Sequence, residues 1–381
     1  MTASGNNPIL EIRNYGQSIW IDNLSRDAIV SGELKELIGS RDVRGITSNP
    51  AIFEKAIAGN KIYDADIAAG ARQSKSVLEI YESLVFEDIR NACDIFQSVY
   101  EESNGLDGYV SVEVPPNLAR DTAGTIAEAQ RYYQEIDRPN VMIKIPGTPE
   151  GLLAVEKVIA AGINVNVTLL FSVASYVETF WAYIRGLEAR VAKGEDISKI
   201  ASVASFFISR IDSNIDDRAA KLSAKTNDPE RKASLEDVKG KVAIANAKIA
   251  YQEYKQILQS ERWQALAAKG ASPQRLLWAS TSTKNPTYKD TIYIEELIGP
   301  DTVNTVPPST IEACADHCDI QSRIETNVEA AYKLIASLKE LGIDIDEVMV
   351  ELLEDGIDKF IKPFDSLMAS LQEKVNQLVP A

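Results

Sequence analysis

Short apolar segments alternate with longer amphipathic segments along most of the chain. The apolar segments have the length and the β-branched composition of strands, and the segments between them show helical periodicity, for example at 118–136, 151–161 and 172–193. This alternation is typical of a parallel sheet covered by helices. The expected strands are 18–23, 45–49, 108–114, 141–147, 163–170, 201–209, 275–281 and 302–307.

Eight strand–helix units fit a closed barrel better than an open sheet. The sequence therefore predicts the α/β class and a (β/α)8 TIM barrel that occupies the whole chain, 1–381, as a single domain. Extra helical insertions are expected around 51–106 and 212–272. A C-terminal helical segment is expected at 321–378, and its part 349–378 is amphipathic and interrupted near Pro363.

Polar side chains recur near the ends of the expected strands, mostly on the face opposite the aliphatic residues. In 141–147, Lys144 shares a face with Met142, because successive side chains of a strand point to opposite faces. In a barrel, inward-facing polar groups at the carboxyl ends converge on the mouth, where barrel active sites lie. The strand-end set contains Asp22, Thr47, Asn49, Ser111, Glu113, Lys144, Asn164, Asn166, Thr168, Ser209 and Ser280.

A lysine that meets two carboxylates limits the chemistry of this mouth. Desolvation in a confined apolar site disfavours an ammonium, and the neutral amine of Lys144 can attack a ketone to form a Schiff base. The protonated imine is an electron sink, so a neighbouring carbon–carbon bond can break. Asp22 and Glu113 can serve the acid–base steps. His317 is the only histidine, so a His-based triad or a His-rich zinc site must use it or be absent.

Each of these residues also has an ordinary structural interpretation. Lys144 can be a strand lysine paired with a carboxylate, and Asp22 and Glu113 can pair with structural cations or cap helices. The strand-end hydroxyl groups can satisfy nearby backbone groups. The coincidence across several strands is what favours the catalytic interpretation.

Composition narrows the partners and the compartment. Lys plus Arg is 40 and Asp plus Glu is 56, which gives a formal net charge of −16. We therefore expect no nucleic-acid or membrane partner, although a local cationic pocket can still bind a phosphorylated substrate. The chain has 3 cysteines, no run of 18 apolar residues and no signal-peptide core in residues 1–8, which favours the cytoplasm.

The last strand–helix unit carries a helix start and a metal-like motif. Ser309 and Glu312 have the spacing of a capping box, with Ser309 as N-cap. Cys314, His317 and Cys318 follow on the expected helix, but structural zinc usually takes four ligands, so we expect no metal. The sequence has no dinucleotide or Walker motif, which indicates no nucleotide cofactor.

Three separated motifs carry a family resemblance. They are GITSNP at 45–50, KIP at 144–146 and NVNVTLLFS at 164–172. Together they resemble the transaldolase family, and the likeness extends from Ile19 to Asp319. The resemblance implies a Schiff-base aldolase-type barrel that moves a dihydroxyacetone unit between sugar phosphates without a metal or organic cofactor. Its usual reaction converts sedoheptulose 7-phosphate and glyceraldehyde 3-phosphate to erythrose 4-phosphate and fructose 6-phosphate, in the pentose phosphate pathway.

Matched residue by residue, the resemblance implies a role for the strand-end groups. Lys144 would form the imine, Asp22 would act as acid and base in bond cleavage, and Glu113 would activate the catalytic water. The remaining matches are Thr168, which would help to hold that water, and Thr47, Asn49, Asn166 and Ser209, which would orient substrate hydroxyls and the imine.

The phosphate end departs from the family pattern. Shorter members carry two arginines there, at positions that Asn214 and Ser282 occupy in this chain. We expect Arg210 and Lys284 to supply the cations instead, beside Ser280. A lysine binds phosphate as a point charge, without the bidentate fork of arginine.

Two other functions stay open at this point. A fructose 6-phosphate aldolase on the same scaffold would release free dihydroxyacetone, and turnover without an aldose acceptor would favour it. A non-catalytic barrel would only bind sugar phosphates. In each case the expected partner is a small sugar phosphate, and the chain is expected to be a monomer or a homodimer.

Overall fold

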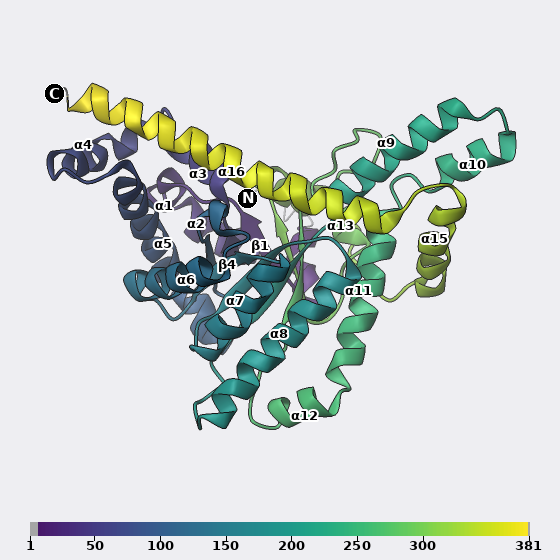
Figure 1. Cartoon of the computed structure of the whole chain (residues 1–381), viewed down its shortest axis with the longest axis horizontal. Coiled ribbons are helices and arrows are strands. Elements are labelled where there is room, and N and C mark those ends of the chain that lie inside the picture. The colour runs from purple at the N-terminus through teal and green to yellow at the C-terminus, as the bar shows by residue number, and fades with distance from the viewer. Residues whose placement is uncertain (1–6, 380–381) are drawn as a thin grey trace, which may run out of the picture.

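The computed structural model describes residues 7–379 and contains a closed barrel of eight parallel strands in sequence order (Figure 1). Pairing of β1 with β8, from Gln17 opposite Thr302 to Ile21 opposite Val306, closes the ring. The expected (β/α)8 barrel is therefore confirmed. Of the segment 1–8, residues 1–6 lie outside the described part of the chain. The strands are β1 Gln17–Asp22, β2 Val43–Thr47, β3 Val110–Glu113, β4 Val141–Pro146, β5 Val165–Leu170, β6 Ser202–Phe207, β7 Arg275–Ala279 and β8 Thr302–Val306.

Helices surround the barrel and cross its carboxyl end (Figure 1). Three short 3-10 turns, η1 Pro8–Tyr15, η2 Lys61–Tyr63 and η3 Pro116–Leu118, accompany them in residues 7–379. The α-helices of the same part of the chain are α1 Arg26–Val30, α2 Glu33–Arg41, α3 Pro50–Ile57, α4 Asp64–Arg72, α5 Val77–Glu102, α6 Thr122–Ile136, α7 Pro149–Ala160, α8 Val173–Ala192, α9 Ser209–Lys225, α10 Pro229–Asp237, α11 Val242–Leu258, α12 Glu261–Ala267, α13 Ile292–Glu295, α14 Pro308–His317, α15 Val328–Glu340 and α16 Ile345–Leu378.

Three of the strands stop two residues earlier than the sequence pattern suggested. Asn49, Ser209 and Ser280 lie just beyond the ends of β2, β6 and β7. Asn49 is the N-cap of α3, and its side chain accepts a hydrogen bond from a backbone N–H at 3.1 Å. Ser209 is the first residue of α9, and Ser280 has a φ of 55°, a left-handed conformation outside the β region, and follows the last residue of β7.

The two long connections are built of helices. The range 51–106 holds nearly all of α3 together with α4 and α5, and α5 packs against β2 and β3. The range 212–272 holds most of α9 together with α10, α11 and α12. In the second range α11 packs against α8, where the rings of Phe180 and Tyr254 stack with their centroids 6.0 Å apart. That the whole chain forms a single domain stays a prediction.

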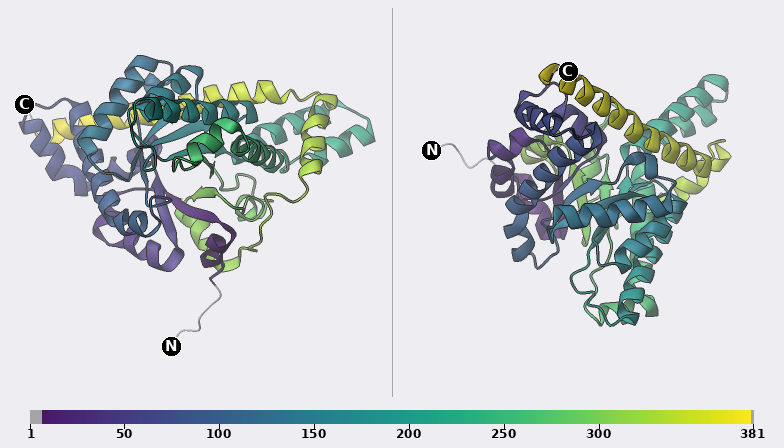
Figure 2. Two further views of the ribbon diagram at one scale, coloured as in Figure 1. Left: turned by 90° about the horizontal axis from the view of Figure 1, so that it is seen from below. Right: turned by 60° about the vertical axis from the view of Figure 1, so that its left-hand side comes forward.

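The C-terminal segment contains α15 and α16, and α16 crosses the mouth of the barrel as one long helix (Figures 1 and 2). The interruption expected near Pro363 is wrong, because α16 runs from Ile345 to Leu378 with Pro363 inside it. A proline in a helix interior loses one hydrogen bond and costs about 3 kcal/mol. Buried Phe360 and Leu367 lie on either side of the proline. Burial of such side chains contributes roughly 2 kcal/mol each, which offsets the cost.

The start of α14 also differs from the expectation. Ser309 is not the N-cap; the helix begins at Pro308, with Pro307 in the N-cap position and no side-chain cap. The fixed φ and the missing N–H of proline suit the first helical position, and this preference outweighs the capping box. Glu312 pairs with Arg41 instead, at 2.8 Å.

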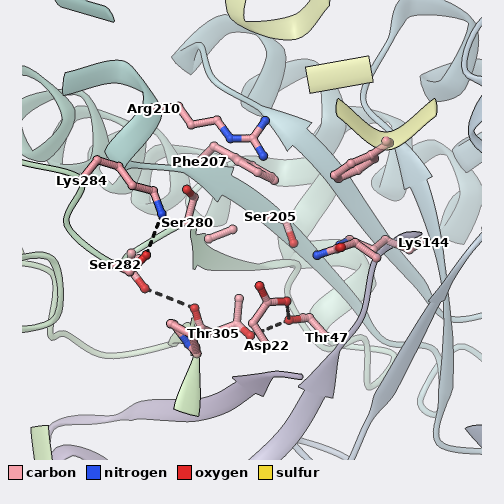
Figure 3. Close-up of a pocket in the computed structure, with 15 residues that line it drawn as sticks. Asp22, Thr47, Lys144, Ser205, Phe207, Arg210, Ser280, Ser282, Lys284 and Thr305 are labelled. Carbon is pink, nitrogen blue, oxygen red and sulfur yellow. Dashed lines mark hydrogen bonds between the residues drawn. The ribbon is translucent and has the colours of Figure 1, made fainter. Parts of the chain in front are cut away.

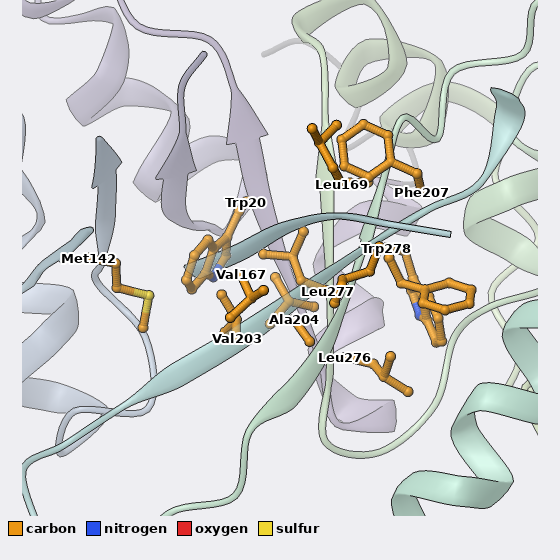
Figure 4. Packing of buried hydrophobic residues seen from close by; sticks show 14 of the residues in the cluster. Trp20, Met142, Val167, Leu169, Val203, Ala204, Phe207, Leu276, Leu277 and Trp278 are labelled. Atoms are coloured by element: carbon orange, nitrogen blue, oxygen red, sulfur yellow. The ribbon is translucent and has the colours of Figure 1, made fainter. Parts of the chain in front are cut away.

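Below the mouth, large side chains fill the barrel. Figure 4 shows Trp20, Val203 and Leu277 gathered among the strands. Trp20 lies so close to β2 that a Cβ on Gly45 would meet its ring at 2.6 Å, so only glycine fits there. The Trp20 Nε1 donates to Asp107 at 3.0 Å, and Asp107 also pairs with buried Arg275. This packed floor leaves free space only at the carboxyl ends of the strands.

Candidate active site

A cavity of about 270 Å³ lies at the carboxyl ends of the strands, under α16 (Figure 3). We call it the active-site pocket. Its lining comes from β1, β2, β4, β6, β7 and β8, from the turns that follow β2, β7 and β8, and from α9 and α16, so the pocket lies at the mouth where the strand ends were expected to converge. Seven of the expected site residues line the pocket: Asp22, Thr47, Asn49, Lys144, Arg210, Ser280 and Lys284. The other four, Glu113, Asn166, Thr168 and Ser209, are buried next to the pocket wall.

Lys144 and Glu113 are brought together by strand register. They are direct partners on β3 and β4, and Lys144 Nζ lies 4.0 Å from Glu113 Oε2. Nζ also donates to the backbone carbonyl of Ser48 at 3.0 Å. Both side chains are buried, and Phe360 of α16 lies over the amine with its ring centroid 5.7 Å from Nζ. The Lys144 amine is thus covered by an aromatic ring from α16.

Glu113 is a buried acid with an unusual proton affinity. Burial raises its pKa to about 8, against the lowering effect of Lys144, and Asp22 adds a smaller rise. Neither carboxyl oxygen has a hydrogen-bond partner within residues 7–379. The carboxyl is therefore mainly protonated near neutral pH and can give a proton to a group bound at Lys144.

Asp22 faces the pocket from the end of β1 and has a hydroxyl partner. Thr47 Oγ1 donates to Asp22 Oδ1 at 2.7 Å. Burial raises the pKa of Asp22, although Lys144, the hydrogen bond from Thr47, Arg210 and Lys284 all lower it. Two carboxyl groups on different strands thus interact electrostatically with the same amine, which suits two separate acid–base steps.

Asn166 is fixed from two sides on the floor of the pocket. Ser205 Oγ donates to Asn166 Oδ1 at 2.7 Å, and Asn166 Nδ2 donates to Ser111 Oγ at 3.0 Å. Register places Asn166 directly beside Lys144 on the neighbouring strand. Thr168 follows two residues later on β5, and its buried hydroxyl has no hydrogen-bond partner in the described residues. A small bound molecule or a water can satisfy it.

The opposite wall of the pocket is cationic. Arg210 packs over the Phe207 ring at 5.1 Å, and Lys284 Nζ donates to Ser282 Oγ at 2.9 Å. Desolvation lowers the pKa of both cations, and for Lys284 the neighbouring Arg210 lowers it further. The Ser209 and Ser280 hydroxyls lie 2.9 Å apart beside them. Two cations at one end of a polar cavity form a site for an anionic group.

Comparison with known proteins decides the family. The family described as Transaldolase/Fructose-6-phosphate aldolase matches the chain over residues 19–371. A protein named Transaldolase from Trichodesmium erythraeum is 69% identical over 98% of this chain and 99% of its own length. The chain belongs to the transaldolase/fructose-6-phosphate aldolase family. A protein named Transaldolase 2 from a Nostoc species is 68% identical over 98% of this chain and 99% of its own length. A protein named Transaldolase from Saccharopolyspora erythraea is 44% identical over 99% of this chain and 100% of its own length.

For this transaldolase-family chain, strand-end reasoning missed several residues of the pocket. Ser205 and Thr305 lie on β6 and β8 and line it, as do Ser282 and Phe360. The alternation of polar and aliphatic residues in TVNTV and SVASFF could have identified the two on strands. Nothing in the local pattern around Phe360 indicates that α16 reaches the mouth.

The residues of the metal-like motif do not converge. Cys314 and Cys318 are buried, whereas His317 is exposed and contacts Asp290 at 2.8 Å and Asp316 at 3.1 Å. No cluster of His, Cys, Asp or Glu in residues 7–379 has the arrangement of a metal site. In the same range, no helix combines the length and the apolar character that a membrane crossing requires.

Proposed function

We propose that this chain is a transaldolase that transfers a dihydroxyacetone unit through a Schiff base on Lys144. The observation that carries the proposal is the buried Lys144 amine, 4.0 Å from Glu113 in a pocket that Asp22 also lines. The family match and the relatives named Transaldolase support the same activity.

In the first half of the reaction, Lys144 Nζ attacks the ketone carbon of a ketose phosphate. The carbonyl oxygen leaves as water, with a proton from Glu113, and the protonated imine remains. Asp22 takes the proton of the β-hydroxyl, the carbon–carbon bond beside that hydroxyl breaks, and the aldose phosphate leaves. The bonding electrons stay on the imine as an enamine. Asn166, beside Lys144, is in position to hold a hydroxyl of the retained three-carbon unit.

In the second half, the enamine carbon attacks the aldehyde of an acceptor sugar phosphate. Asp22 returns its proton to the new hydroxyl, and water then hydrolyses the imine to free the product ketose. We assign Glu113 and Thr168 to that water, and Thr47, Asn49, Ser209 and Ser280 to the substrate hydroxyls. We assign Arg210 and Lys284 to the phosphate group.

We propose sedoheptulose 7-phosphate and fructose 6-phosphate as the ketoses, and glyceraldehyde 3-phosphate and erythrose 4-phosphate as the aldoses, within the pentose phosphate pathway. The cationic wall opposite Lys144 supports phosphorylated substrates. We also propose a cytoplasmic location, which the free thiols of Cys93, Cys314 and Cys318 support. The absence of a nucleic-acid partner and the monomeric or homodimeric state stay predictions.

The test is to trap the intermediate. The enzyme is incubated with fructose 6-phosphate, reduced with borohydride and digested, and the adduct is mapped by mass spectrometry. We expect the three-carbon adduct on Lys144 and none on Lys248, a second buried lysine away from the pocket. An active preparation in which Lys144 stays unmodified would refute the Schiff base, and a protein that binds sugar phosphate without turnover would be a binding barrel.

The family description also names fructose-6-phosphate aldolase, so this activity is the second candidate. The two activities share every step up to the enamine and differ in what discharges it. Fructose 6-phosphate is supplied with and without erythrose 4-phosphate, and free dihydroxyacetone is measured. A transaldolase produces sedoheptulose 7-phosphate only with the acceptor, whereas an aldolase releases dihydroxyacetone at the same rate in both reactions.

A further inference from the structure

A chain of hydrogen bonds connects Asp22 to a threonine that has no role in the mechanism above. Thr47 Oγ1 donates to Asp22 Oδ1 at 2.7 Å, and the hydroxyls of Thr47 and Thr305 lie 2.6 Å apart. Figure 3 shows Asp22, Thr47 and Thr305 close together on one side of the pocket. Thr305 is 3% exposed and lines the pocket, so its hydroxyl is enclosed in protein yet adjacent to the substrate space.

Counting hydrogens fixes the direction of this chain. A hydroxyl has one hydrogen, and Thr47 uses its hydrogen on ionised Asp22. The bond between the two threonines must then be donated by Thr305. While Asp22 is ionised, Thr305 can therefore offer the pocket only a lone pair.

A proton on Asp22 Oδ1 reverses the chain. The carboxylic acid then donates to Thr47, Thr47 donates to Thr305, and the hydrogen of Thr305 is free to point into the pocket. Each threonine needs only a rotation about its Cβ–Oγ bond, and no bond in either threonine breaks.

Other contacts hold Thr305 at this position. Thr281 Oγ1 lies 2.8 Å from Asn304 Oδ1 and 3.2 Å from the backbone carbonyl oxygen of Thr305, and the two acceptors share its single hydrogen. These bonds tie the turn after β7 to the end of β8. The charged and titratable groups around Asp22 are Lys144 on β4, Arg210 on α9, Lys284 in the turn after β7 and Glu113 on β3.

We propose that Thr305 is a positioning residue for the acid–base carboxyl, and that its hydroxyl changes from acceptor to donor toward the pocket when Asp22 carries a proton on Oδ1, the oxygen that Thr47 contacts. This inference rests on the proposed function. It adds Thr305 to the same site. It also couples the protonation state of Asp22 to whether the pocket offers the substrate a hydrogen-bond donor or an acceptor.

The change of direction matches the chemistry of cleavage. Before the carbon–carbon bond breaks, the substrate carries a β-hydroxyl whose proton goes to Asp22. Afterwards the same oxygen belongs to an aldehyde carbonyl, which can only accept. The donor at Thr305 thus becomes available in the step in which an acceptor appears, and it is withdrawn when Asp22 is ionised again.

The test compares Thr305→Val, which keeps the shape, with Thr305→Ser, which keeps the hydroxyl. Without a donor from Thr305, the hydroxyl of Thr47 is less polarised and stabilises the carboxylate less. We expect Thr305→Val to lower kcat/KM for transfer about 3- to 10-fold. We expect the acid limb of its kcat/KM profile to move up by roughly half a pH unit. Thr305→Ser should match the wild type in both measurements.

Thr302→Val is the matched control on the same strand. Thr302 is buried, donates to the Gly299 carbonyl at 2.6 Å and has no link to Asp22. Its loss should lower thermal stability but leave the acid limb unmoved. An acid limb that is unchanged in Thr305→Val, or a Thr305→Ser variant that behaves like Thr305→Val, would overturn the inference.

Borohydride trapping separates this inference from the proposed function. Thr305→Val should form the Lys144 adduct as fully as the wild type does, because imine formation does not involve the hydrogen bonds that connect Thr305 and Thr47 to Asp22. A wild type without the adduct would refute the proposed function itself. If Thr305→Val does not fold, the alternative test is neutron diffraction of wild-type crystals at one pH above and one pH below the pKa of Asp22. The Thr305 deuterium should point toward Thr47 at the higher pH and into the pocket at the lower, and a single orientation at both would overturn the inference.

Discussion

Replacing Glu113 with glutamine should make the protein more stable at alkaline pH while it lowers activity. The carboxyl is buried, and its pKa is raised from the ordinary 4.5 to about 8. Between these two values the unfolded chain carries an ionised Glu113, whereas the folded protein keeps the proton. The folded state binds more protons in this window, so the contribution of Glu113 to stability falls as the pH rises and is constant above about 8.

The size of the effect follows from the same two values. At about 1.4 kcal/mol per pH unit, the interval corresponds to roughly 5 kcal/mol. The amide of a Glu113→Gln variant does not titrate, so the variant avoids this loss. We expect its free energy of unfolding, minus that of the wild type, to rise by about 4 kcal/mol between pH 5 and pH 9, because pH 5 already lies above the lower of the two pKa values. The same variant should lose about 10²- to 10⁴-fold in kcat, because it cannot move the proton.

The assay is urea unfolding of both proteins at several pH values. Titrating groups that do not interact with Glu113 behave alike in the two proteins and cancel in the difference, whereas Lys144 and Asp22 interact with it. Lys144→Met provides the control background: Lys144 lowers the pKa of Glu113, so without it the dependence on pH should extend to higher pH. A difference in stability that is the same at pH 5 and pH 9 would mean that folded Glu113 is ionised throughout, and the reasoning would be refuted.

Four further substitutions probe the other parts of the pocket. Asp22→Asn should lower kcat for transfer by about 10²- to 10⁴-fold, whereas borohydride should still trap an adduct on Lys144. Turnover and labelling are measured in parallel on the same preparation. Lys284→Ala and Arg210→Ala should each raise KM for fructose 6-phosphate roughly 10- to 100-fold in steady-state kinetics, with little effect on KM for unphosphorylated dihydroxyacetone as donor. Phe360→Ala should lower the free energy of unfolding by about 3–5 kcal/mol in urea titration, because a buried ring over the pocket is lost.

Much of the site could be predicted because strand periodicity is a local property. The alternation in VMIKIP places Lys144 on the inner face, and the same argument places Glu113 there. What the pattern does not contain is register. That Glu113 and Lys144 are direct partners, with 4.0 Å between charged atoms, depends on how β3 and β4 align, which many residues of the barrel decide together.

The errors of the sequence reasoning arose where two local rules compete. Ser309 and Glu312 satisfy the spacing of a capping box, but Pro308 suits the first turn of a helix better, and α14 begins there. Pro363 is a helix breaker in isolation, yet α16 continues through it, because tertiary packing contributes more than the missing hydrogen bond. Thr305 was overlooked although TVNTV alternates like the other strands.

The placement of α16 explains why a part of the site lies beyond sequence reasoning. Its amphipathic pattern indicates that one face is buried but not which surface receives that face. Ion pairs such as Arg218–Glu351 and Lys374–Asp64 lie on either side of Phe360, but exposed pairs of this kind contribute about 1 kcal/mol or less. The fit of the apolar face to the mouth must therefore decide the position of the helix. Phe360 reaches the Lys144 amine only because the barrel beneath has already formed, so this contact depends on tertiary structure and has no signature in the segment that supplies it.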